Sequence, residues 1–183
     1  MMDKKNQGKM KFYNFRRNFG VLIEDNGRET KVNPEQFLSV PVDDEQVYYV
    51  KTGNQISEIE GYYSYHFKRM VLDLENHDYD KFCDMARDYA MVLNEGKVTT
   101  SQIRKVYSQI YRAQKVLDIK HLRPQFAYTA GRNNETPRLG ELMHILDHLA
   151  KHAESKTEQE KVHLKNIKTF LEAIVAYLKY VGN

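Results

Sequence analysis

The segment between residues 97 and 138 carries a concentration of positive charge that the rest of the chain lacks. It holds 9 basic and 2 acidic side chains, a formal charge of +7, whereas the whole chain of 183 residues has a net charge of +3. Lysine and arginine at this density neutralise phosphates and release the counterions around them. The segment therefore predicts a polyanionic partner, bound through the phosphate backbone of that partner. The simpler alternative is that these residues form a solvated helix surface that binds no partner. The basic residues are Lys97, Arg104, Lys105, Arg112, Lys115, Lys120, Arg123, Arg132 and Arg138.

Much of this charge is expected on one helix over residues 99–117. Thr99 and Gln102 have the spacing of a capping box, which predicts where the helix begins. Its apolar face would consist of Ile103, Val106, Ile110, Ala113 and Leu117. The opposite face would present Arg104, Lys105, Ser108, Tyr111, Arg112 and Lys115. The remaining basic residues are expected at or near helix ends, from which a long side chain can reach a ligand.

Residue types that support catalysis or metal binding occur singly or in weak patterns. Cys83 is the one cysteine and falls on the apolar stripe of a predicted helix, so we expect it to be a buried small hydrophobe. That helix should end at Gly96 in a glycine cap, and its stripe consists of Tyr79, Phe82, Cys83, Ala86, Tyr89, Ala90 and Leu93. His144, His148 and His152 recur at i+4 spacing, but no carboxylate-rich motif completes a metal site. The sequence has no phosphate-binding loop, nucleophile elbow or zincin motif. We therefore expect no enzyme, no metal and no cofactor.

The elements that position these residues change in type near residue 61. Residues 1–61 contain five short runs typical of strands, at 9–13, 19–24, 29–32, 47–51 and 55–59, with a helical turn at 34–38. These runs predict a small five-stranded barrel of the oligonucleotide-binding (OB) type. Residues 62–183 follow helical periods and predict an all-α bundle of about five helices. The expected fold class is α+β, with domains at 1–61 and 62–183.

Composition favours a soluble, cytoplasmic protein without a membrane partner. Apolar residues make up 41% of the chain, which is enough for a core. No apolar run reaches the roughly 18 residues that suggest a membrane span. The amino terminus, MMDKKNQGKM, is charged and lacks the apolar region of a secretory signal.

The barrel region resembles the opening of a cold-shock domain through the stretches Lys11–Asn14 and Arg17–Leu22. The resemblance implies an OB-type barrel whose exposed aromatic rings stack on single-stranded bases, with Phe12 and Phe19 at stacking positions. A further aromatic position of that family is occupied by Val21 here, and the later strand at 30–33 lacks the family's phenylalanine and histidine. On the residues alone, Phe12 and Phe19 can equally fill or flank a small barrel.

Three stretches of the helical part, Val98–Arg104, Leu122–Arg132 and Phe170–Tyr180, resemble in order and separation the small subunit of type III-A CRISPR effector (Csm) complexes. The match spans about residues 65–182. It implies a non-catalytic antiviral-defence subunit that stacks along guide RNA and target RNA, contacts other CRISPR effector subunits and self-associates into a short filament. A barrel in front of the bundle departs from that family's general pattern. A free-standing single-stranded RNA-binding protein that uses the barrel therefore stays open as the alternative.

Overall fold

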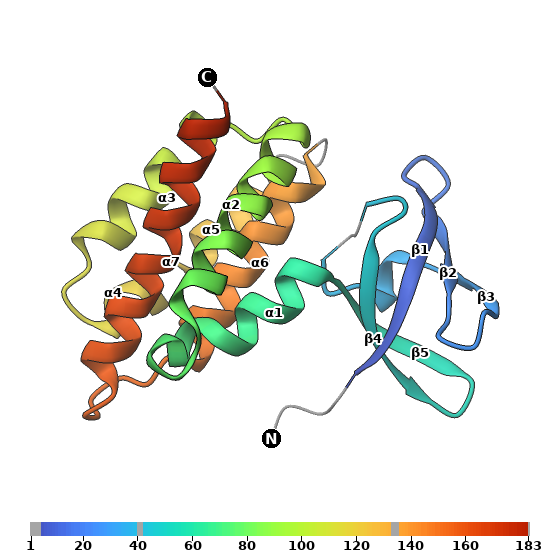
Figure 1. The fold of residues 1–183 in the computed structure, drawn as a ribbon, viewed down its shortest axis with the longest axis horizontal. Coiled ribbons are helices and arrows are strands. Elements are labelled where there is room, and N and C mark those ends of the chain that lie inside the picture. The colour runs from blue at the N-terminus through green and yellow to red at the C-terminus, as the bar shows by residue number, and fades with distance from the viewer. Residues whose placement is uncertain (1–4, 40–41, 133–135, 183) are drawn as a thin grey trace. The chain divides into compact units, whose positions relative to one another are not determined.

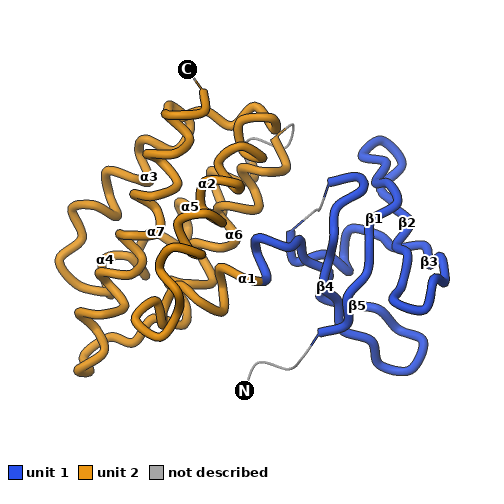
Figure 2. Tube along the Cα trace, in the orientation of Figure 1, with its two compact units in different colours: residues 1–65 blue, residues 66–183 orange. Residues whose placement is uncertain are grey.

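The computed structural model describes residues 5–39, 42–132 and 136–182, and the chain divides into two compact units (Figure 2). Unit 1 comprises residues 1–65 and contains the β-strands, whereas unit 2 comprises residues 66–183 and is helical. Helix α1, Tyr62–Met70, begins in unit 1 and ends in unit 2. Within unit 1, its Tyr65 stacks on Tyr48 with ring centroids 3.7 Å apart.

The strands of unit 1 form a curled antiparallel half-barrel with the order β3-β2-β1-β4-β5 (Figure 1). The strand bounds are β1 Asn6–Asn14, β2 Phe19–Ile23, β3 Glu29–Val32, β4 Gln46–Thr52 and β5 Gln55–Gly61, with a 3-10 turn η1 at Pro34–Gln36. All five runs predicted from the sequence are strands, and the predicted hairpin turn is present, with Gly27 at a φ of 82°. The α+β class is therefore confirmed.

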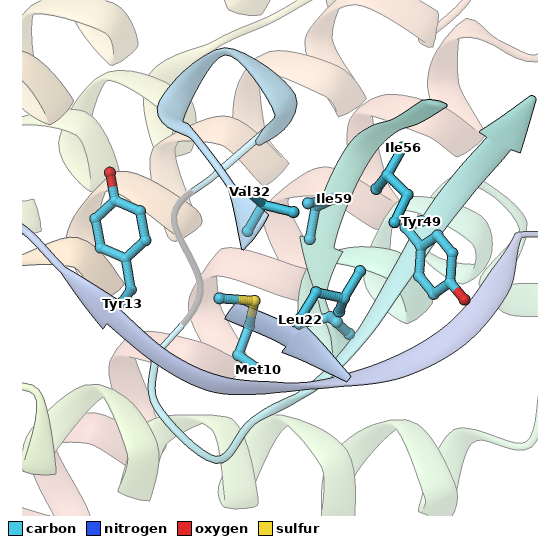
Figure 3. Close-up of a cluster of buried hydrophobic side chains, with 8 residues drawn as sticks. Met10, Tyr13, Leu22, Val32, Tyr49, Ile56 and Ile59 are labelled. Carbon is cyan, nitrogen blue, oxygen red and sulfur yellow. The ribbon is translucent and has the colours of Figure 1, made fainter. Parts of the chain in front are cut away.

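A β-bulge decides which side chains of β1 enter the core of the half-barrel. Met10 and Tyr13 are both buried, although residues three apart in a regular strand point to opposite faces. The register with β2 shifts between Met10 and Phe12, which makes Lys11 the extra residue. The bulge turns Phe12 outward. The core in Figure 3 consists of Met10, Tyr13, Leu22, Val32, Val47, Tyr49, Ile56 and Ile59.

In unit 2 the last helix, α7, packs against η2, α2, α3 and α4, while α6 packs against α5, α4 and α2 (Figure 1). The bounds are η2 Val71–Asn76, α2 Tyr79–Glu95, α3 Thr100–Arg112, α4 Val116–Lys120, α5 Arg123–Arg132, α6 Pro137–His152 and α7 Glu160–Val181. Phe170 of α7 lies 4.9 Å from the ring of Phe67, which in turn contacts Phe82 and Tyr89. These buried rings lie at the point where α1, α2 and α7 meet.

The single helix predicted over residues 99–117 is wrong, because the chain breaks after Arg112 and restarts as α4. The backbone N–H groups of Gln114 and Lys115 donate to the carboxylate of Asp118, at 2.9 and 3.2 Å. In a continuous helix these N–H groups would bond to carbonyls one turn earlier, so the Asp118 carboxylate replaces the acceptors that the break removes. The Lys168 ammonium donates to the carbonyl of Ala113 at 2.6 Å, which caps the end of α3.

Two smaller expectations for α2 also need correction. Cys83 is half-buried rather than buried, and Tyr79, placed on the apolar stripe from its spacing, is exposed. Both lie at the edge of the stripe, where α7 covers the helix only in part. The inner members of the stripe, Phe82, Ala86, Tyr89, Ala90 and Leu93, are buried as predicted.

Candidate nucleic-acid interface

Helix α3 carries the exposed part of the basic segment. Its start has the predicted capping box, in which the Gln102 side chain accepts from the Thr99 N–H at 2.8 Å and the Thr99 hydroxyl accepts from the Gln102 N–H. Ile103, Val106 and Ile110 are fully buried, and α3 packs against α7. Burial of this stripe leaves the opposite side of α3 facing solvent.

Four basic side chains of this region are exposed and unengaged. Arg104, Lys105 and Arg112 lie on α3, and Lys97 lies in the connection that precedes it. None of these four makes a side-chain hydrogen bond or ion pair with another residue in the part of the chain that the structure describes. Lys115 is exposed as well, but it precedes α4 and is not on α3. These side chains keep their donors available for phosphate oxygens.

Close packing at the end of α2 sets the backbone of Lys97. A Cβ at Gly96 would lie 2.7 Å from the Cγ of Arg138, so this position needs a glycine for space. Gly96 itself has an ordinary φ of −74°, and the left-handed turn predicted for it falls on Lys97, with a φ of 59°. That conformation is uncommon for a residue with a side chain. It ends α2 and leaves Lys97 exposed.

Lys120 and Arg123 are held by partners on α6. The Lys120 ammonium donates to the carbonyl of Lys151 at 2.9 Å. The Arg123 guanidinium forms a two-bond pair with Asp147, at 2.7 and 3.2 Å, and this pairing raises the pKa of Arg123. Both residues remain partly exposed, but their donors are already directed at the protein.

Arg138 lies inside unit 2, although we expected it at or near a helix end, where its side chain could reach a ligand. It is 8% exposed, and its guanidinium donates to the Glu141 carboxylate at 3.2 Å. Glu141 is itself 1% exposed. The guanidinium is therefore committed to a buried carboxylate one turn away. The side chain of Arg132, also among the candidates, lies outside the described residues.

The three histidines of α6 do not converge on a common point. The His148 and His152 rings stack with centroids 4.0 Å apart, and the Nε2 atom of His144 lies 3.3 Å from the Lys68 ammonium. Across residues 5–39, 42–132 and 136–182, no group of three or more histidine, cysteine or acidic side chains has metal-binding geometry. Within the same ranges, no helix is both long and apolar enough to span a membrane.

Tyr111 was predicted on the basic face of α3, but its pairing with Tyr107 was not predicted from the sequence. The rings of Tyr107 and Tyr111 stack with centroids 6.0 Å apart and planes 29° apart. Tyr111 is 60% exposed, and Tyr107 is half-buried. The i, i+4 spacing of two tyrosines beside Arg104 and Arg112 was the available signal.

The half-barrel presents a second, smaller surface. Phe12 and Phe19 are half-buried and lie outside the core, with ring centroids 5.8 Å apart in an edge-to-face arrangement. The Lys31 ammonium lies 4.7 Å from the centroid of the Phe19 ring. The two rings therefore flank the core and do not fill it.

Comparison with known proteins identifies the helical part of the chain. The family described as Csm2 Type III-A matches residues 76–183. The "CRISPR system Cms protein Csm2" of Streptococcus thermophilus is 35% identical over 95 residues, which is 46% of this chain and 74% of that protein. No solved structure matches the chain.

Proposed function

Because the chain belongs to the type III-A Csm2 family of CRISPR effector subunits, we propose that it is a non-catalytic subunit that holds paired guide RNA and target RNA on the exposed face of α3. Copies would stack into a short filament along the duplex and contact other effector subunits. The observation that carries the proposal is the set of unengaged basic side chains Lys97, Arg104, Lys105 and Arg112.

The chemistry of this face suits a duplex backbone. A-form RNA hides its base edges in a deep, narrow groove, so a protein that holds it without reading sequence contacts phosphates and sugars. Residues 97–117 contain no aspartate or glutamate, so no carboxylate on the same segment competes for the guanidinium groups. Positive charge without local compensation also increases the rate of encounter with a polyanion.

Charge reversal on α3 tests the proposal within the assembled effector. We expect Arg104→Glu with Arg112→Glu to reduce co-purification of guide RNA and binding of target RNA. The matched control is Lys161→Glu with Lys165→Glu, which makes the same change in charge at two exposed lysines one turn apart on α7. If both pairs of substitutions leave assembly and target binding at the level of the unaltered chain, α3 does not hold RNA.

A second candidate function rests on the half-barrel, as an OB-type single-strand binder. Two adjacent phenylalanine rings with a lysine over one of them have the composition of a stacking site, since base faces stack on aromatic rings and cations lie beside phosphates. We expect Phe19→Ala in the full chain to weaken binding of a short single strand and to leave duplex binding unchanged. Tyr180→Ala, which removes an exposed aromatic ring from α7, serves as the control. Equal binding by all three proteins would refute the stacking site and favour a protein-docking or spacer role for the half-barrel.

A further inference from the structure

We propose that Tyr107 and Tyr111 form a stacking site for a single unpaired nucleotide, so that α3 prefers RNA with an unstacked base to a uniform duplex. The inference rests on the proposed function and adds a substrate feature to it. It begins from the arrangement of the two rings. Because helical side chains lean toward the N-terminus, the Tyr111 ring extends back over Tyr107, as their 6.0 Å separation shows.

The position of the pair on the helix distinguishes it from other exposed tyrosines. Arg104 and Arg112 are eight residues apart, which corresponds to about 12 Å along the axis. The leaning Tyr111 ring lies between these two levels. Cations on either side of an exposed ring can hold the phosphates that flank one nucleotide while the ring meets its base. By contrast, exposed Tyr79 begins an acidic helix turn between Asp78 and Asp80.

The geometry of RNA decides which nucleotide this ring can contact. Bases inside a continuous A-form helix stack on one another, and their faces are not available to a side chain. A tyrosine face can therefore reach a base only where that base has left the stack, as at a bulge or in a single strand. Half-buried Tyr107 packs against the exposed Tyr111 ring, and this contact lowers the cost of ordering Tyr111.

A protein partner is the competing occupant, since tyrosine and arginine are common at protein interfaces. The surroundings of the pair favour RNA. The nearest acidic residue after Lys97 is Asp118, and its carboxylate is occupied by the N–H groups of Gln114 and Lys115. A helix whose own sequence carries several cations and no acidic residue matches a polyanion better than it matches a mixed protein surface.

The test compares three RNA probes by fluorescence anisotropy with the full-length chain. The probes are a uniform duplex, the same duplex with one bulged adenosine, and the same duplex with an abasic nucleotide at the bulge. We expect the unaltered chain to bind the adenosine bulge more tightly than the abasic bulge. Tyr111→Ala should abolish this preference, a loss on the order of 5- to 100-fold, because one stacked base contributes that much. Affinity for the uniform duplex should change less than twofold.

Two further variants separate stacking from other roles. Tyr111→Phe should keep the preference, because stacking needs the ring and not the hydroxyl, and Tyr180→Ala should keep it as well. If the chain binds all three probes equally, or if Tyr111→Ala weakens all three alike, the stacking site is refuted while the proposed function stands. If no probe shows salt-dependent binding, both are refuted. Loss of co-purifying effector subunits with unchanged RNA binding in Tyr111→Ala would assign the pair to a protein contact and overturn the inference.

Discussion

Arg138 gives the sharpest test of which basic residues belong to the RNA-binding face. It lies in the same basic segment as Arg104 and Arg112, but its guanidinium pairs with Glu141 inside unit 2. Arg138→Ala leaves the Glu141 carboxylate without this cation in a nearly water-free environment. Breaking a buried ion pair by removing one partner costs about 3–5 kcal/mol.

That loss is a large part of what holds a domain of this size together. Folded domains are typically stable by about 5–15 kcal/mol. Unit 2 spans residues 66–183, and an unfolding entropy of about 2.1 cal/mol/K per residue makes each kcal/mol worth about 4 °C, so Arg138→Ala should lower its melting temperature by about 12–20 °C. Urea unfolding followed by far-ultraviolet circular dichroism measures the change in unit 2, which contributes nearly all of the helix signal.

A mutant cycle separates the pair from other effects of the substitutions. Arg138→Ala and Glu141→Ala together should cost less than the sum of the two single changes, by about 0.5–3 kcal/mol. Lys105→Ala, at an exposed basic residue of the same segment, should alter stability by less than about 0.5 kcal/mol. The reasoning is refuted if Arg138→Ala melts with the unaltered chain and weakens duplex RNA binding as much as Arg104→Ala does.

Three further predictions follow from the same geometry. Arg104→Ala with Arg112→Ala should reduce the slope of log affinity against log salt for an RNA duplex by up to about 2, because each lost phosphate contact removes about 0.7–1 from the slope. Lys120→Ala with Arg123→Ala should reduce the slope less, because both side chains are held by α6. Gly96→Ala should destabilise unit 2 by about 1–3 kcal/mol in urea unfolding, because the new methyl group would contact Arg138. The control is Gly140→Ala on α6, where the new methyl group has open space, so this substitution should not destabilise unit 2. In unit 1, hydrogen bonds from Lys51 and Thr30 hold the pKa of Glu24 below its ordinary value. The ionised Glu24 therefore stabilises the fold at pH values above its unfolded-state pKa of about 4.3. This contribution is lost as the pH falls through the folded-state pKa. Glu24→Gln should therefore flatten the decline in stability between about pH 5 and pH 3, and equal acid sensitivity of the two proteins would contradict this.

The strands and most helix boundaries could be predicted because their signals are local. Thr99 and Gln102 cap α3 through atoms three residues apart, and Gly27 supplies the left-handed turn that its hairpin needs. The break after Arg112 is stabilised by local bonds to Asp118 and also by Lys168, which is 55 residues away and donates to the Ala113 carbonyl. A helical period that continues through residues 113–117 carries no information about that contact.

The same distinction explains which candidate site residues remain on the exposed face. The segment over which charge was summed, residues 97–138, stops three residues before Glu141 and also excludes Asp147. These two carboxylates form ion pairs with Arg138 and Arg123, respectively. Glu141 is only three residues from Arg138 on α6, so a slightly longer window would have included it, whereas Asp147 reaches Arg123 only because α5 packs on α6. The charge of Arg104, Lys105 and Arg112 was predicted to be exposed because the apolar stripe of their own helix already fixes their orientation.

The two candidate interfaces lie in separate units and rest on separate evidence, so one probe can test whether they act together. The family match begins at residue 76 and covers α3, but it does not reach Phe12 or Phe19. If one chain holds a duplex on α3 and a single strand on the half-barrel, a duplex with a single-stranded tail should bind about 10²–10⁴ times more tightly than either part alone. Phe19→Ala and Arg104→Glu should then each remove that gain. A tailed duplex that binds no more tightly than the plain duplex would leave α3 as the RNA interface and would favour a protein-docking or spacer role for the half-barrel.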